Sequence, residues 1–162
     1  MKNQNFNLLA LFILFSLASL STAWAQCDMK VKKQGIKGQI LWREGNFMPT
    51  MDGNKNKNQK AFIEKGISRE LFVYALTKTK DTEREGVFFT KINTKKIAQI
   101  SSNEEGCFAL DLPTGKYSLF VLEPNQQWFA NRFDGEGNIM VIEVKKKQST
   151  EVNIIIDYKA TY

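Results

Sequence analysis

The sequence predicts an all-β protein, an antiparallel β-sandwich of about seven to eight strands. The chain has 162 residues, of which 43% are hydrophobic and 25% charged, which is enough for one packed domain. Short runs of β-branched and aromatic residues alternate with clusters of Gly, Asn, Pro and Lys. After residue 25, no apolar stripe with the helical period of about 3.6 residues reaches helix length. We therefore expect many short strands, frequent turns and little helix.

The first 25 residues are expected to be a signal peptide. Lys2 precedes the apolar run Leu8–Leu20, and Ala23 and Ala25 occupy the small-residue positions that signal peptidase reads. An apolar run of about 13 residues is shorter than the roughly 20 that span a bilayer, which argues against a membrane anchor. Cleavage after Ala25 would leave one domain, residues 26–162, in the periplasm, the cell envelope or the medium.

The two cysteines are expected to form a disulfide, because an even pair in an oxidising compartment usually pairs. Cys27 could instead carry a lipid anchor, but Gln26 directly before it makes a poor lipoprotein cleavage site. A catalytic thiolate at Cys107 would need a base, and the chain contains no histidine.

Eight segments are expected to form the strands of one core between residues 35 and 158. They are residues 35–42, 70–77, 87–92, 96–100, 107–112, 117–123, 139–144 and 151–157. Residues 70–77 are apolar on both faces, so both faces should be covered. Elsewhere alternation assigns one face to the core. The inward side chains expected from it are Ile36, Ile40, Trp42, Phe108, Leu110, Leu112, Tyr117, Val152, Ile154 and Ile156.

The polar loop 52–60 is expected to be mobile and to lie outside the core. Asp52, Asn54 and Asn56 stand at alternate positions, as the first ligands of an EF-hand calcium loop do. However, Lys57 stands where that loop needs Gly, and Ile63 where it needs the bidentate Glu.

The connection 125–138 is the candidate ligand-binding loop, because it combines aromatic rings with amide, guanidinium and carboxylate groups. Its candidate binding residues are Trp128, Phe129, Asn131, Arg132 and Asp134. The rings could stack on a sugar or a peptide, and the alternative is that they cap one end of the sandwich. Oxygens of Asp134, Glu136 and Asn138 could ligate calcium, although Asp134–Gly137 is typical of a hairpin turn. We expect the turn, no metal site and no cofactor.

The absence of histidine excludes Ser-His-Asp and Cys-His catalysis and the common histidine-ligated metal centres. Glu104 and Glu105 are adjacent, so in an extended segment they point to opposite faces. We interpret them as part of a tight turn. The protein is expected not to be an enzyme, and a histidine-free hydrolase using paired acids is the alternative from another class.

Two stretches resemble the transthyretin-like (prealbumin-like) sandwich of carboxypeptidase regulatory-like domains. Residues 35–40, "GIKGQI", are similar to the Gly-x-hydrophobic strand of that family. The residues that match its turn and the following strand are Asn103, Gly106, Phe108, Leu112, Gly115, Tyr117, Leu119 and Val121. The chain departs from the pattern in its long stretch between Gly45 and Arg69 and in Cys107.

The resemblance implies a non-catalytic folding, attachment or binding module of a secreted or envelope protein. Two enzyme groups that share this sandwich, the hydroxyisourate hydrolases and the intradiol dioxygenases, rely on histidines that this chain lacks. The formal net charge of +6 comes from lysines spread mainly over the expected turns. An envelope glycan or another exported protein is the expected partner, an anionic envelope surface is a further possibility, and nucleic acid is not expected.

Overall fold

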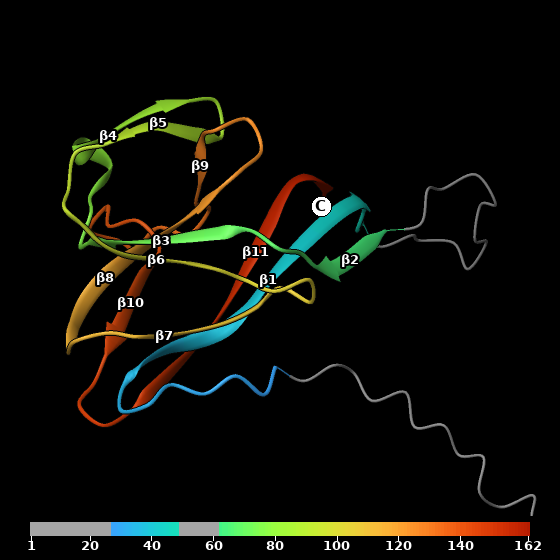
Figure 1. Cartoon of the computed structure of the whole chain (residues 1–162). Helices are drawn as coiled ribbons and strands as arrows, with labels where there is room; N and C mark the ends of the chain where they lie inside the picture. The colour runs from blue at the N-terminus through green and yellow to red at the C-terminus, as the bar shows by residue number, and fades with distance from the viewer. Residues whose placement is uncertain (1–26, 49–61) are drawn as a thin grey trace, which may run out of the picture.

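The computed structural model describes residues 27–48 and 62–162 (Figure 1). These residues form eleven strands and one 3-10 turn, η1 (Thr79–Asp81). The strands are β1 (Gly35–Asn46), β2 (Ile63–Gly66), β3 (Glu70–Ala75), β4 (Thr82–Glu85), β5 (Phe88–Ile92), β6 (Lys96–Ser101), β7 (Cys107–Asp111), β8 (Gly115–Leu122), β9 (Trp128–Phe129), β10 (Val141–Val144) and β11 (Ser149–Thr161). All eight predicted segments contain a strand. The predicted signal peptide and the loop 52–60 lie outside the described residues.

The strands form two sheets, which confirms the all-β sandwich. One has four strands in the order β11-β1-β2, with β7 also paired to β1. The other has seven in the order β4-β5-β9-β8-β3-β6, with β10 also paired to β8. The pairing is antiparallel except between β1 and β11, where Ile40 lies opposite Ile154 in a parallel register. Parallel neighbours need a long crossover, and the whole seven-stranded sheet provides it.

The predicted inward residues line the space between the sheets. Ile36, Ile40, Phe108, Ile154 and Ile156 are fully buried. Also buried are Trp42, Leu112, Tyr117 and Val152. Leu110 is only half-buried and packs at the margin of this core. The period-2 alternation therefore predicted the correct face of β1, β7 and β11.

A second apolar layer covers the other face of β3, as its two apolar faces predicted. Leu71, Phe72, Val73 and Tyr74 are all buried. The ring of Phe72 packs edge-on against Trp128, with centroids 6.3 Å apart, and Tyr74 meets Phe120 in the same way at 5.6 Å. Trp128 belongs to β9, and in Figure 1 the β4–β5 hairpin lies over β3. Strands β4, β5 and β9 thus fold back over the other strands of their own sheet.

Three strands were not predicted, β2, β4 and β9. The residues of β2 and β4 are almost all exposed and polar, so no apolar alternation marks them. β9 has only two residues. Edge strands of this kind are held by backbone pairing and by charged side chains, which leave no hydrophobic pattern.

Candidate functional site

Glu104 and Glu105 occupy a tight turn and face solvent. The side chain of Asn103 accepts the Cys107 N–H at 2.7 Å, and the backbone carbonyl of Asn103 accepts the Gly106 N–H at 2.9 Å. Gly106 has φ 80°, and a Cβ there would overlap the carbonyl oxygen of Ile40. The turn therefore requires glycine at this position.

Cys27 and Cys107 form a disulfide whose Cα atoms are 5.5 Å apart. It links residues 80 positions apart in the chain, and Cys107 is buried at the start of β7. The bridge fixes the segment 27–34 against the four-stranded sheet. Neither sulfur is a free thiol.

The aromatic residues of the candidate loop point into the protein. Phe129 is 3% exposed, and its ring centroid lies 5.5 Å from that of Tyr158. Trp128 is half-buried against Phe72, and its indole N–H is buried without a hydrogen-bond partner. Phe129 is therefore a core residue and not a ligand contact. Trp128 exposes only part of its indole ring to solvent. The packing of these two rings fits a cap on one end of the sandwich better than it fits a surface on which a sugar stacks.

Asn131 and Arg132 are exposed and reach the outer edge of β11. The Asn131 amide donates to the carbonyl of Ile155 at 3.1 Å and to the carboxylate of Asp157 at 2.9 Å. Arg132 donates to the carbonyl of Asn153 at 3.4 Å, a long and weak contact. The two side chains engage two carbonyls of an edge that no neighbouring strand pairs.

A groove separates the free edges of β10 and β11. It has a volume of about 550 Å³, and its lining combines the apolar Ile142 and Val152 with several polar and charged side chains. Thr150 donates to the carbonyl of Glu143 at 2.6 Å and closes one end. Arg132 lines the other end and also lines a smaller hollow of about 210 Å³. Side chains, and not paired backbones, bridge this side of the sandwich among the described residues.

Asp134 organises a hairpin turn, as expected. Its carboxylate accepts the backbone N–H groups of Glu136 and Asn138 at 2.9 and 2.8 Å and the Asn138 amide at 2.7 Å. These hydrogen bonds, first of all that from the Asn138 side chain, lower the pKa of Asp134. Both carboxylate oxygens are thus engaged within the turn. Among the described residues, no three His, Cys, Asp or Glu side chains gather in a way that could hold a metal ion.

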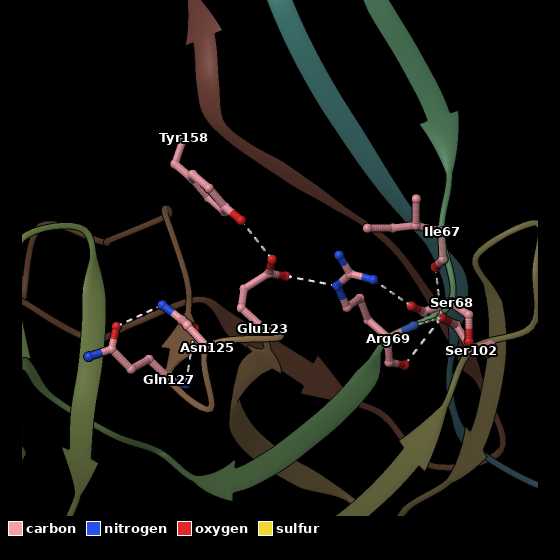
Figure 2. A network of polar contacts seen from close by, with 8 residues as sticks. All are labelled: Ile67, Ser68, Arg69, Ser102, Glu123, Asn125, Gln127 and Tyr158. Atoms are coloured by element: carbon pink, nitrogen blue, oxygen red, sulfur yellow. Dashed lines mark hydrogen bonds and ion pairs between the residues drawn. The ribbon is translucent and has the colours of Figure 1, made fainter.

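A buried carboxylate links the two sheets at the end of β8 (Figure 2). The side chain of Glu123 is 1% exposed and lies between Arg69, whose Nε is 3.2 Å away, and the Tyr158 hydroxyl, which donates at 2.9 Å. Glu123 and Arg69 flank strands of the seven-stranded sheet, and Tyr158 belongs to β11 in the other. Burial first, and then the hydrogen bond to Glu123, raise the pKa of Tyr158 to about 12.

Sequence reasoning missed this network, although a signal for it existed. Glu123 continues the alternation Tyr117, Leu119, Val121, all of which point into the protein. Tyr158 continues the inward series of Val152, Ile154 and Ile156 in the same way. A charged residue in phase with an apolar series indicates a buried partner.

Ser102 extends the polar contacts at this end. Its hydroxyl accepts the Arg69 N–H at 2.9 Å and donates to the Ile67 carbonyl at 3.0 Å. The Arg69 backbone is thereby fixed beside the guanidinium that pairs with Glu123. Both carboxylate oxygens of Glu123 are engaged within the network, and none of its residues lines the groove, so we interpret it as structural.

No family model, no curated protein and no solved structure matches this chain. In the described residues, no helix is long and apolar enough to cross a membrane.

Proposed function

We propose that this protein is an exported, non-catalytic binding module that holds an extended peptide in the groove between β10 and β11. The observation that carries this proposal is the pair of free strand edges that border one groove. Asn153 and Ile155 turn their carbonyls to the outer side of β11, where Asn131 and Arg132 reach them. An added strand uses such an edge for backbone hydrogen bonds.

Arg132 is the residue in this groove best suited to engage a ligand. It is exposed, its contact with Asn153 is long, and it takes part in none of the three ion pairs among the described residues. A guanidinium in this state can turn to a backbone carbonyl or a carboxylate of a bound peptide. Asn131, with two shorter hydrogen bonds, holds the adjacent edge in place.

A peptide suits the groove better than a glycan does. Sugar recognition relies on exposed aromatic faces, and the two rings of this loop pack against Phe72 and Tyr158. Strand edges, in contrast, offer donors and acceptors at regular spacing to any extended backbone. The partner expected from this chemistry is an extended segment of another exported protein.

Four observations support an exported module without catalysis. The N-terminal sequence has the pattern of a signal peptide, and the disulfide suits an oxidising compartment. The chain has no histidine to serve as a general base at neutral pH. The motifs that resemble carboxypeptidase regulatory-like domains favour the same role.

The groove also has a feature that favours the alternative, a histidine-free hydrolase. Glu143 and Glu151 both line it, so two carboxylates border the space in which we place the peptide. Mass spectrometry of a bound peptide after prolonged incubation separates the two functions. The binding module returns the peptide intact, whereas a hydrolase returns fragments whose formation stops in the Glu143→Gln or Glu151→Gln variant.

The proposal is tested by selecting peptides from a displayed random library and measuring their affinity for four proteins. These are the unaltered chain, Arg132→Ala, Arg132→Lys and, as a control, Arg43→Ala, whose side chain pairs with Glu64 on β2 and does not line the groove. We expect Arg132→Ala to weaken binding at least about tenfold with an unchanged melting temperature, and Arg132→Lys to weaken it less. Equal affinity for Arg132→Ala and the control, or no selected peptide at all, would contradict the proposal.

A further inference from the structure

Six lysines gather at the end of the sandwich opposite the Glu123 network. Three segments meet there, residues 31–34, 111–116 and 143–148, and we call them together the lysine end. It lies at the lower left of Figure 1, where β1 and β8 begin and β10 ends. Its lysines are Lys32, Lys33, Lys116, Lys145, Lys146 and Lys147, all of them exposed.

Gln34 ties the three segments together, so the lysines share one surface although they are far apart in sequence. Its side chain accepts the Lys147 N–H at 3.1 Å and donates to the Leu112 carbonyl at 3.3 Å. Its own carbonyl accepts the Leu112 N–H at 3.2 Å. The next residue, Gly35, donates to the carbonyl of Gln148 at 3.2 Å. The backbone beneath the lysines is therefore fixed.

The positive charge of this surface is not neutralised within the protein. The acids on the three segments are Asp111, whose carboxylate accepts the Lys32 N–H at 2.8 Å, and Glu143, which lies opposite Lys116. None of the ion pairs among the described residues includes a lysine of the lysine end. Like charges held close together repel one another. A polyanion that covers this surface relieves the repulsion and so binds favourably.

The kind of charge and the shape around it favour a broad anionic surface over a single bound anion. All six cations are lysines, which act as point charges on flexible stems, and none is an arginine with a fork that grips one phosphate. Lys32 and Lys33 border a shallow groove of about 490 Å³, whose mainly apolar lining includes Leu112 and Pro113. Lysine stems that flank apolar surface suit the headgroup region of a membrane.

We propose that the lysine end is a docking surface for a membrane rich in anionic lipids. Each lysine near such a surface strengthens binding by about fivefold, and several together give a reversible attachment that depends on salt. Docking at this end would hold the sandwich on the bilayer through the three segments of the lysine end. Lys145 also lines the groove between β10 and β11, so that groove begins at the docked end of the protein. This inference stands independently of what the groove binds.

The test is sedimentation of the intact protein with vesicles of phosphatidylcholine, with and without phosphatidylglycerol. One variant replaces Lys145, Lys146 and Lys147 by Gln. The backbone of Lys147 has positive φ, so a substitution there can disturb the local turn. A second variant therefore leaves that turn unchanged and replaces Lys32, Lys33 and Lys116 by Gln. The control variant replaces Lys65, Lys80 and Lys95, which are exposed elsewhere, and so changes the net charge equally. Every variant keeps residues 8–20, so any affinity of that apolar run for lipid is common to all.

We expect binding that requires the anionic lipid and falls at least about tenfold in both lysine-end variants but not in the control. It should disappear near 1 M salt, where the Debye length falls to about 3 Å. Equal binding of all variants would overturn the proposal, as would equal binding to neutral vesicles. So would lysine-dependent binding to heparin, a soluble polyanion, without binding to the anionic vesicles.

Discussion

The two ends of β8 differ in where they place charge, which is buried at one end and exposed at the other. At its C-terminal end Glu123 is buried, with one oxygen on Arg69 and the other on Tyr158. At its N-terminal end Lys116 is exposed beside five other lysines. A buried charge must be paired to offset its desolvation, and the pairing joins the two sheets in one geometry. An exposed cluster adds no such constraint and leaves its charge available to a partner.

This contrast separates residues that build the fold from residues that are free to bind. The Glu123 network involves both sheets, so any change there should be seen in the free energy of unfolding. The lysine end is held by Gln34 and by the disulfide, so its lysines should be replaceable without loss of stability.

The largest effect is expected from the disulfide, which holds the segment 27–34 that carries Lys32 and Lys33. Replacing Cys27 and Cys107 together by Ala should lower the free energy of unfolding by about 4 kcal/mol in the chain-entropy model, because the bridge closes a long loop. Urea unfolding monitored by tryptophan fluorescence measures it. Two alkylatable thiols in the native exported protein, found by mass spectrometry without reductant, would contradict the bridge.

The next effect is expected at the Glu123 end. Arg69→Met leaves the Glu123 carboxylate buried without its cation and should cost about 2 to 3 kcal/mol, less than for a fully buried pair because the Arg69 side chain is 25% exposed. The control is Arg43→Met, which breaks a more exposed pair with Glu64 and should cost about 0 to 1 kcal/mol. Equal losses in urea unfolding would mean that Glu123 is not held by Arg69 as we describe.

Tyr158→Phe should cost less, about 1 to 2 kcal/mol near neutral pH, because one oxygen of the buried Glu123 loses its donor. The pH dependence distinguishes this cause from lost packing. The folded pKa of Tyr158 is raised to about 12 from an ordinary value of about 10. The stabilisation is therefore fully present below pH 10 and is lost as the pH rises towards 12. The difference between the two proteins should shrink over this range, and a constant difference would argue against the hydrogen bond.

The smallest effect on stability is expected at the lysine end. Replacing Lys145, Lys146 and Lys147 by Gln should change the free energy of unfolding by no more than about 0.5 kcal/mol, because these side chains are exposed and form no ion pair. A slight gain is the favoured direction, since the change removes repulsion between like charges. A loss of 2 kcal/mol or more in urea unfolding would show that the lysines belong to the fold.

The sequence predicted the strands that bury an apolar face and missed those that do not. The alternation of Ile36, Ile40 and Trp42 determines which face of β1 is buried, because a shift by one residue would turn all three side chains to solvent. β2 and β4 have no such constraint, and only their neighbours make them strands. The parallel pairing of β1 with β11 depends on contacts between the two ends of the domain, which no local pattern encodes.

The candidate site was predicted less well than the fold. Composition marked residues 125–138 as unusual, but it could not separate Phe129, which turns inward, from Arg132, which turns outward. That difference arises because β9 pairs with β5 and β8 and places Phe129 beside Tyr158. The groove itself lies between β10 and β11, which a short connection joins but which belong to different sheets. No local pattern predicts that two consecutive strands leave their facing edges unpaired.

Amide hydrogen exchange along β11 measures whether its outer edge is open to a bound peptide. Val152 and Ile154 turn their backbone groups towards β1, so their amides should exchange slowly. The amides of Glu151, Asn153 and Ile155 lie on the outer side of β11, away from β1. They should exchange faster and should become protected when a selected peptide binds. Slow exchange at all five amides of the free protein, or no added protection with the peptide bound, would contradict the account.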